Sequence, residues 1–340
     1  MSHTKVAIVI LNWNGVHYLQ KFLPILISKT RYCDAQFYVA DNGSTDGSID
    51  YINSTFPYIN VIRLSTNLGF AKGYNEALKM VDAQYFMILN SDVEITEGWL
   101  KPLVEFLDCR EEVGVCMPKI KSAFYKDYFE YAGASGGFID YFGYPFCRGR
   151  ILSHIERDCG QYDCNKEIFW ASGAAMLIKS DLYRKLGGFD DNFFAHMEEI
   201  DLCWRAKTMG YQVWVVPESV VYHVGGGTLP NNSPKKLYLN YRNNLLMLYK
   251  NLPSNRLWTI IFARMLLDGL SAILYFFQGK RSFFDSVISA HKDFYKMRKD
   301  IIRQKEIPRV NCIYRGSIVF SFFASIMKPK FINLESKIRQ

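Results

Sequence analysis

Oxygen-bearing side chains follow one apolar run of the sequence in a pattern that suits cation binding. Asn90, Ser91 and Asp92 come directly after the run Tyr85 to Leu89. Carboxylate, amide and hydroxyl oxygens are the hard ligands that Mg²⁺ and Mn²⁺ prefer, and a pyrophosphate group would complete the coordination shell. The pattern predicts Asp92 as a metal ligand, with Asn90 and Ser91 beside the bound group.

The segment from Asn67 to Asn75 contains glycines that would let its backbone approach a ligand at the start of a helix. Lys72 adds positive charge, which makes Asn67, Gly69, Lys72 and Asn75 candidate ligand contacts. The segment matches neither the G-x-G-x-x-G fingerprint after the first strand nor the P-loop pattern. A dinucleotide dehydrogenase and a P-loop NTPase are therefore disfavoured.

Two adjacent acids, Glu198 and Glu199, begin a predicted helix that extends to Met209 and ends at Gly210. The partial positive charge of a helix N-terminus favours the ionised form of such acids, and a carboxylate there could accept a proton. The alternative is that Glu198, Glu199 and Asp201 only complement the helix dipole. For an acid taken alone, that is the simpler explanation.

His223 lies just before the glycines 225 to 227. Most single histidines have structural roles. On a flexible glycine-rich segment, however, a neutral imidazole could reach a metal, and the glycines could let a lid fold over the ligand. His223 is therefore a second candidate metal ligand.

Apolar runs that alternate with helical patterns predict the elements that position these residues. Strands are expected at 6–11, 37–40, 61–64, 85–89, 171–178 and 211–216. One helix is expected around the apolar stripe Leu19, Phe22, Leu23 and Leu26, a second from the turn at 42–46 through Ile52, and two more at 69–80 and 198–209. This order predicts a mostly parallel sheet with helices on both faces, whose ligands bind beyond the carboxyl ends of the strands. Asp41 and Asp92 lie at such ends, and Asn12 and Asn14 follow the first strand.

The composition is that of a folded protein with a large core, because 49% of the 340 residues are hydrophobic. The eight cysteines form no C-x-x-C pair and no export signal opens the chain, so we expect reduced thiols in the cytosol. A zinc site at Cys159 and Cys164 would lack further ligands at the usual spacing.

The positive charge is concentrated in the C-terminal region. Residues 280–340 contain 14 Lys and Arg against 5 Asp and Glu, whereas residues 1–279 contain 27 against 28. The preceding run, 257–277, is apolar but includes Arg264 and Asp268, which would be costly at the centre of a bilayer. We therefore expect helices that lie in a membrane interface, with a helical cap on the catalytic domain as the alternative. Nucleic acid is not an expected partner, because no binding signature accompanies the basic residues.

Taken together, the order of these features resembles the family-2 inverting glycosyltransferases with the GT-A fold. Within this family the chain is most similar to bacterial rhamnosyltransferases and related polysaccharide-building enzymes. The resemblance covers about residues 6–250, and its segments are VAIVILNWNG, ADNGSTDGS, NLGFAKGYNEAL, YFMILNSDVE, ASGAAMLI, LGGFDDNFF, MEEIDLCWRA, GYQVWVVPE and YHVGGGT.

The resemblance implies a GT-A catalytic domain at residues 1–250, a Rossmann-like mixed sheet flanked by helices, and a helical C-terminal region at 251–340. It also implies roles for individual residues. In this family the position of Asp41 binds the nucleotide base, and Asn67, Gly69 and Lys72 line the nucleotide and diphosphate. Asp92 corresponds to the last acid of the metal-binding D-x-D-like motif, and His223 to a histidine near the metal and diphosphate. Glu199 corresponds to the second acid of the E-D motif, which is the catalytic base. This sequence has Asn90 at the first D-x-D position and Glu198-Glu199 as its E-D motif, so which acid is the base stays open.

The activity implied is a metal-dependent, inverting transfer from a UDP- or dTDP-linked sugar to a saccharide or lipid-linked saccharide acceptor, at the cytoplasmic face of a membrane. Three alternatives remain: a sugar-1-phosphate nucleotidyltransferase, a non-catalytic sugar-nucleotide binding protein and a structural membrane adaptor. The first normally has a glycine- and arginine-rich loop after its first strand, where this chain has Asn12 to Gly15.

Overall fold

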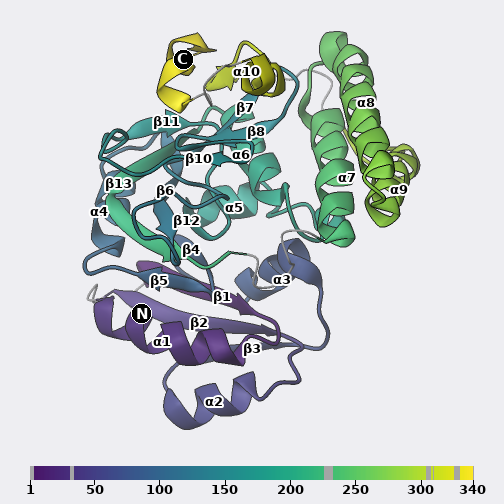
Figure 1. Ribbon diagram of the computed structural model, residues 1–340. Coiled ribbons are helices and arrows are strands. Elements are labelled where there is room, and N and C mark those ends of the chain that lie inside the picture. The colour runs from purple at the N-terminus through teal and green to yellow at the C-terminus, as the bar shows by residue number, and fades with distance from the viewer. Residues whose placement is uncertain are drawn as a thin grey trace.

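A mixed sheet forms the centre of the molecule in the computed structural model (Figure 1). The structure describes residues 4–30, 34–225, 233–303, 308, 310–324 and 330–339. In the described part of the chain the order of the sheet is β11-β13-β6-β12-β4-β1-β2-β3, with β5 paired to β13. The strands are β1 (Val6–Asn12), β2 (Ala35–Asn42), β3 (Asn60–Leu64), β4 (Tyr85–Asn90), β5 (Val93–Ile95), β6 (Val113–Ser122), β11 (Lys166–Ile168), β12 (Ala175–Lys179) and β13 (Gln212–His223).

The first half of the sheet is built from βα units, as the alternating pattern predicts. Strands β1, β2, β3 and β4 run parallel to one another, whereas β12 is antiparallel to both β4 and β6. The sheet is therefore mixed, and the expectation that it is mostly parallel was wrong. The helices of this part are α1 (Val16–Lys29), α2 (Ser48–Thr55), α3 (Gly69–Leu78), α4 (Leu100–Asp108), α5 (Ser180–Lys185) and α6 (Glu198–Thr208), with a 3₁₀ turn η1 (Asp191–Phe193) before α6.

Two strand boundaries differ from the sequence prediction for clear reasons. The strand expected at 171–178 begins only at Ala175, because Ser172 and its neighbours form a turn in which Ala175 N donates to Ser172 O at 3.2 Å. The strand expected at 211–216 instead continues to His223. It crosses Pro217, which cannot donate a ladder hydrogen bond, through a register shift against β6 between Val216 and Val220.

A second, smaller sheet joins the middle of the chain to its C-terminal segment. Its strands are β7 (Gly137–Asp140), β8 (Pro145–Cys147), β9 (Arg150–Ile151), β10 (His154–Ile155), β14 (Ile313–Tyr314) and β15 (Ile338–Arg339). Strand β14 runs parallel to β7, with Ile313 opposite Ile139. Short 3₁₀ turns η2 (Phe331–Asn333) and η3 (Glu335–Lys337) and the helix α10 (Ile318–Ala324) complete this segment. The C-terminal segment thus shares a sheet with the part of the chain that we expected to be a separate domain.

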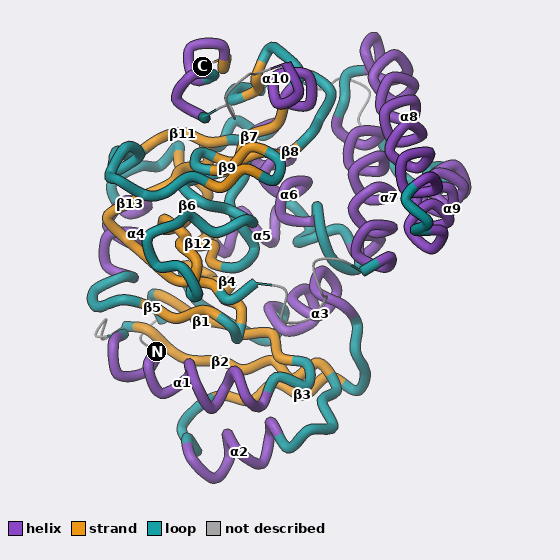
Figure 2. The backbone as a smooth tube through the Cα atoms, in the orientation of Figure 1, coloured by secondary structure: helices purple, strands orange, loops and turns teal. Residues whose placement is uncertain are grey.

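Three long helices stand side by side at one flank of the sheet (Figure 1, Figure 2): α7 (Pro234–Asn251), α8 (Ser254–Phe277) and α9 (Arg281–Met297). Ser233 caps α7 by accepting a hydrogen bond from Lys236 N at 3.2 Å. Among the described residues, α8 is the one helix whose length and apolar composition would suffice to cross a membrane, and 28% of its most apolar window is buried. Arg264 and Asp268 on α8 are buried against the rest of the protein.

Candidate active site

The carboxyl ends of β1 and β2 bring Asn12, Asn14 and Asp41 together. The strand register places Asn12 opposite Asp41, and Asn12 Nδ2 donates to Asp41 Oδ1 at 3.4 Å. Ser44 links the three residues: its backbone N donates to Asp41 Oδ2, and its Oγ accepts from Asn14 N at 2.9 Å. Asn12 Oδ1 is buried without a hydrogen-bond partner. This edge of the sheet therefore presents one buried carboxylate and one unsatisfied amide oxygen.

The segment before α3 is held in place by Asn42 at the end of β2. Asn42 Nδ2 donates to Asn67 Oδ1 at 3.2 Å and to Gly69 O at 3.0 Å, while Asn67 Oδ1 also accepts from Gly69 N at 2.9 Å. Gly69 has a φ of 81°, and a Cβ there would lie 2.5 Å from the Phe194 ring. Only glycine can therefore let this turn contact Phe194.

The other two candidates on α3 differ in their surroundings. Lys72 is exposed on the helix. Asn75 is occupied by internal contacts, since its Nδ2 donates to Phe189 O and Asp191 Oδ1, and its Oδ1 accepts from Tyr183 Oη at 2.6 Å. The geometry of Asn75 indicates that it fixes the turn before α6, and its role in ligand binding stays a prediction.

Strand pairing brings Asp92 and His223 into contact although 131 positions separate them. Strand β5 pairs with β13 so that His223 lies opposite Val93, directly after Asp92. His223 Nε2 lies 3.1 Å from Asp92 Oδ1, and both side chains are buried. Asn90 and Ser91 lie beside them at the end of β4, where Asn90 N donates to Ala174 O. His223 is thus the last residue of a strand, which corrects the expectation that it lies on a glycine-rich loop; Gly226 and Gly227 lie outside the described residues.

Glu130 is a buried acid on the other side of the His223 ring that the sequence motifs did not indicate. Its Oε2 lies 3.6 Å from His223 Nδ1, an ion-pair distance rather than a hydrogen bond. Burial alone would lower the pKa of His223, but the charges of Asp92 and Glu130 outweigh it and raise this pKa to about 10. The same contact keeps the pKa of Asp92 low despite its burial. In this arrangement His223 is an imidazolium between two carboxylates.

Glu198 and Glu199 begin α6 as predicted, but their protonation differs from the expectation. Burial raises the pKa of Glu199 to about 7, and burial together with the charge of Glu199 raises the pKa of Glu198 well above its ordinary value. Glu198 Oε2 and Glu199 Oε2 are buried without hydrogen-bond partners. The helix N-terminus was expected to keep both acids ionised. That expectation was wrong, because the cost of removing a carboxylate from water exceeds the helix-dipole contribution of about 1 kcal/mol.

The loop that precedes these acids has an unusual backbone. Phe194, His196 and Met197 all have positive φ values, of 60°, 71° and 73°. Such conformations are costly for residues with a Cβ and are frequent at functional sites. Burial and the nearby charge of Lys236 lower the pKa of His196 to about 4, so this side chain is neutral. The strained loop therefore carries a neutral imidazole two residues before Glu198.

A buried asparagine on α7, also missed by sequence reasoning, stabilises this loop. Asn243 Nδ2 lies 2.7–2.9 Å from the carbonyl oxygens of Phe193, Ala195 and His196. On the following helix turn, Asp201 of α6 accepts from Lys250 and Asn251 of α7 and from Arg205. The loop and α6 are thus fixed to α7 by polar contacts at both ends.

The segment 171–174 connects the acids with the Asp92–His223 pair. A Cβ on Gly173 would lie 3.8 Å from Glu199 Cβ and 3.0 Å from the Phe70 ring. The next residue, Ala174, accepts the hydrogen bond of Asn90 N, and the preceding one, Ser172, donates to Ala132 O beside Glu130. The chain segments that carry Glu199, Asp92 and Glu130 therefore meet at one turn.

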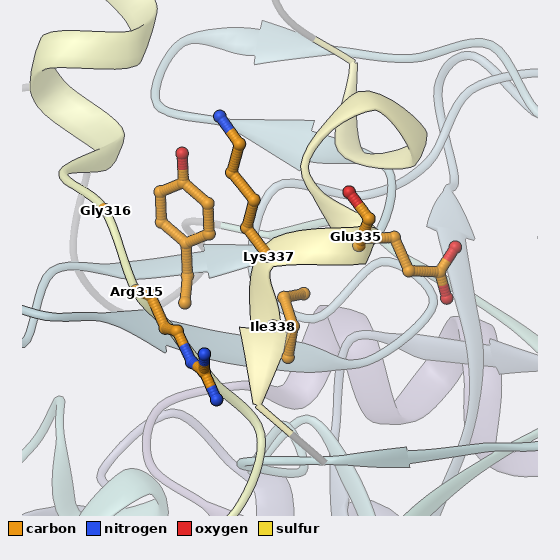
Figure 3. Close-up of a pocket in the computed structure, with 7 residues that line it drawn as sticks. Arg315, Gly316, Glu335, Lys337 and Ile338 are labelled. Carbon is orange, nitrogen blue, oxygen red and sulfur yellow. The ribbon is translucent and has the colours of Figure 1, made fainter.

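A separate cavity of about 740 Å³ lies in the C-terminal segment and contains none of the predicted site residues. It is lined by Tyr314 to Gly316 and Glu335 to Ile338. Figure 3 shows the charged ends of Arg315, Lys337 and Glu335 pointing in different directions. The cavity lacks a convergent set of polar groups, so the site beyond β4 remains the candidate active site.

Comparison with known proteins agrees with this geometry. Residues 7–184, more than half of the chain, match the glycosyl transferase family 2 model. A relative from Mycobacterium tuberculosis, an N-acetylglucosaminyl-diphospho-decaprenol L-rhamnosyltransferase, is 24% identical over 236 residues, which cover 64% of this chain and 75% of the relative.

Two solved structures have a similar fold. GalNAc-T7 with UDP, GalNAc and Mn²⁺ aligns with a TM-score of 0.58 at 13% identity, over 91% of this chain and 59% of that chain. A mannosyltransferase from Pyrobaculum calidifontis with GDP-Man and Mn²⁺ aligns with a TM-score of 0.53 at 14% identity, over 87% of this chain and 88% of that chain. The chain belongs to glycosyl transferase family 2, and it is a glycosyltransferase with the GT-A fold.

Proposed function

We propose that this glycosyltransferase moves a sugar from a UDP- or dTDP-linked donor to a saccharide or lipid-linked saccharide, with inversion at the anomeric carbon, in the synthesis of a cell-surface polysaccharide. The observation that carries the proposal is the turn at 171–174, where the segments bearing Glu199 and Asp92 meet. A base and a pair of candidate metal ligands on two sides of one turn suit an in-line displacement.

Glu199 is the proposed general base. It takes the proton from an acceptor hydroxyl, and the oxygen attacks the anomeric carbon from the face opposite the diphosphate. The bond between that carbon and the diphosphate oxygen breaks, and its electron pair leaves with the diphosphate. A carboxyl with a pKa of about 7 suits this task, because a substantial fraction is ionised at neutral pH and the base still binds a proton well. Burial and the charge of Glu199 raise the pKa of Glu198 well above its ordinary value, which favours the protonated form of Glu198.

The donor set around Asp92 fits a divalent cation. Mg²⁺ usually binds to one or two protein carboxylates and takes its other ligands from substrate phosphates and water. Asp92 and His223 would hold the ion, and His223 Nε2 must first lose its proton. No cluster of three ligating side chains is preformed in the part of the chain that the structure describes, so the diphosphate would have to contribute ligands. The ion would neutralise charge on the departing diphosphate.

The nucleotide would lie at the carboxyl ends of β1 and β2. Asp41 and the unsatisfied Asn12 Oδ1 present acceptors there for the N–H groups of a base. Asn14 lies beside them, and the tight turn at Asn67 and Gly69 borders the same strand end through Asn42. Lys72 is exposed nearby on α3, where its charge suits the diphosphate.

We further propose that the protein works at the periphery of the cytoplasmic face of a membrane. The support is the apolar helix α8, the basic C-terminal region and a relative whose name describes a decaprenol-linked substrate.

A panel of nucleotide sugars tests the proposal. The melting temperature of the full chain would be measured with each donor, with and without Mn²⁺, because a ligand of the native state raises it. We expect stabilisation by a UDP or dTDP sugar that depends on the metal, and slow donor hydrolysis without acceptor. Pyrophosphate release from a sugar phosphate and a nucleoside triphosphate would instead indicate a nucleotidyltransferase. Binding without any turnover would indicate a non-catalytic module.

A further inference from the structure

The helix α8 has two faces of opposite character. Its buried side chains include Leu257, Ile260, Ile261, Arg264, Asp268 and Ala272. Its exposed large apolar side chains are Trp258, Phe262, Leu266, Leu270, Ile273, Leu274, Phe276 and Phe277, each with at least 50% of its surface exposed. At about 100° per residue, these eight side chains fall within an arc of about 160° on one side of the helix. We call them the outer stripe of α8.

Two charged residues of α8, Arg264 and Asp268, lie on its buried face and contact the rest of the protein. Arg264 lies with its guanidinium 3.5 Å from the centre of the Tyr144 ring and donates to Phe142 O at 3.4 Å. It also pairs with Asp268 at 3.6 Å, and His291 of α9 lies 3.5 Å from the same carboxylate. These contacts fix the inner face of α8 to the protein. The outer stripe contacts the protein at its two ends, where Trp258 lies near Tyr249 and Phe276 lies near Phe284. All eight of its side chains nevertheless keep at least half of their surface exposed.

Cations flank the outer stripe at both ends. Lys280 and Arg281 are exposed directly after its last residue, Phe277. At the other end, the Arg298 guanidinium lies 5.2 Å from the centre of the Trp258 ring, and the next residue, Lys299, is exposed. From 280 to 303 the sequence has seven Lys and Arg against three Asp. An aromatic and aliphatic stripe bordered by cations is the chemistry of a surface that enters the headgroup region of an anionic bilayer.

The same charges argue against a second copy of the chain packing on the outer stripe. If two outer stripes packed antiparallel, Lys280 and Arg281 of one copy would face Arg298 and Lys299 of the other. A parallel arrangement would bring identical cations together. Either pairing places like charges in contact, whereas phosphatidylglycerol headgroups would neutralise them.

We infer that the outer stripe of α8 and its flanking cations form a membrane-docking surface that lies in the plane of an anionic bilayer. This inference deepens the proposed peripheral location, and it does not depend on the roles of Asp92 or Glu199. The helix axis would run parallel to the membrane, with the stripe among the lipid chains nearest the headgroups.

The test is co-sedimentation of the full chain with vesicles. One set would contain phosphatidylcholine alone, and the other phosphatidylcholine and phosphatidylglycerol in equal amounts. The combined variant Phe262→Ser, Leu266→Ser, Leu270→Ser removes apolar side chains from the middle of the stripe. The control Tyr58→Ser, Met80→Ser changes two large side chains that are 62% and 63% exposed elsewhere on the protein. Circular dichroism and melting temperature check that each variant folds.

We expect binding to the mixed vesicles, weaker binding to phosphatidylcholine alone, and a loss of more than about tenfold for the stripe variant but not for the control. Lys280→Glu with Arg281→Glu should weaken binding to the mixed vesicles and leave the phosphatidylcholine result unchanged. A wild-type protein that sediments with neither set of vesicles overturns the inference. The inference is also overturned if the stripe variant binds vesicles as the wild type does. If, in addition, analytical ultracentrifugation shows a dimer for the wild type and a monomer for the variant, the stripe joins two copies of the chain instead. Donor hydrolysis, measured on the same samples, reports on the proposed reaction separately.

Discussion

The side-chain amide of Asn243 donates a hydrogen bond to the carbonyl oxygen of His196 at 2.7 Å, across 47 positions of the chain. His196 is one of the residues in the left-handed region before the two acids, and its carbonyl shares this donor with those of Phe193 and Ala195. A conformation that is unfavourable by itself is thus maintained from α7. We expect the direction in which Glu199 points to depend on this contact.

Asn243→Ala tests that dependence. The substitution leaves three carbonyl groups without their donor, so we expect the free energy of unfolding to fall by about 1–3 kcal/mol and kcat to fall by more than about tenfold. The matched control is Asn244→Ala, because Asn244 is equally buried and donates to Gly143 O, while its contact with the loop, 3.9 Å to Met197 Sδ, involves none of the three backbone carbonyls. Urea unfolding and sugar transfer would be measured for both. Equal kcat values in the two variants would show that the loop keeps its shape without Asn243.

The neighbouring acids can be distinguished by isosteric replacement. Glu199→Gln removes the proposed base, and we expect kcat to fall by a factor of about 10²–10⁴ with little change in donor affinity. Glu198→Gln should have a much smaller effect, because burial and the charge of Glu199 raise the pKa of Glu198 and so favour its protonated form, which Gln resembles. Single-turnover transfer and donor titration measure the two quantities. The reverse order of effects would assign the base to Glu198.

The raised pKa of Glu199 predicts how activity changes with pH. Its base form increases as the pH rises through about 7, so kcat should rise about tenfold per pH unit below that value and then level off. In Glu199→Gln this step should disappear from the pH profile of the residual activity. A profile that is flat between pH 5 and about 8 in the wild type would contradict the assignment.

The same pKa shift predicts a change in stability of known sign. Burial raises the pKa of Glu199 above the ordinary 4.5, so the folded state binds a proton more tightly than the unfolded state. Its contribution to the free energy of unfolding is therefore complete below pH 4.5 and is lost as the pH rises through about 7. Glu199→Gln, which cannot ionise, should lose less stability over this interval. Chemical unfolding at several pH values measures the difference.

Removal of Asp92 tests the metal site. In Asp92→Ala we expect Mn²⁺ to add nothing to the affinity for UDP, whereas in the wild type the ion should increase it by at least about tenfold. Isothermal calorimetry with and without the metal measures both values. Glu94→Gln is the control, since it removes a nearby acid that pairs with Lys126 at the surface. An unchanged response to Mn²⁺ in Asp92→Ala would refute the role of Asp92 in holding the ion.

Gly69 offers a test of the turn before α3. Gly69 and Gly98 have φ values of 81° and 68°, but only at Gly69 would a Cβ collide with Phe194. Gly98→Ala should cost about 1–2 kcal/mol for the left-handed backbone. Gly69→Ala should cost more and should also weaken donor binding, because the turn must move. Thermal unfolding and donor titration would show this, and equal costs in the two variants would argue against close packing on Phe194.

The sequence predicts the βα half of the fold well, because apolar periodicity is strong there. The buried stripe Leu19, Phe22, Leu23 and Leu26 of α1 is confirmed, and β1, β2, β3 and β4 lie within three residues of their expected bounds. The extension of β13 past Pro217 was missed, since a proline in a run ordinarily ends a strand and only the register shift accommodates it here.

Some residues of the site can be predicted from local sequence patterns, and others cannot. Asp92, His223 and the two acids stand in recognisable segments, and pairing of β5 with β13 explains why the first two meet. Glu130 and Asn243 stand in no such segment. Their importance arises from contacts across 93 and 47 positions, which depend on how elements pack and not on neighbouring residues. The pKa values of Glu198 and Glu199 likewise depend on burial, which overrides the local helix dipole.

The polar contacts of α7 with α6 have a geometric consequence if the acceptor is lipid-linked, as we propose. Lys250 and Asn251 hold the acid-bearing helix from one side, while α8 and α9 pack against other faces of α7. A bilayer in contact with α8 would thereby fix the height of the catalytic carboxylate above the lipid surface. The enzyme would then prefer acceptors whose hydroxyl lies at this height above the lipid, before any contact with the sugar itself.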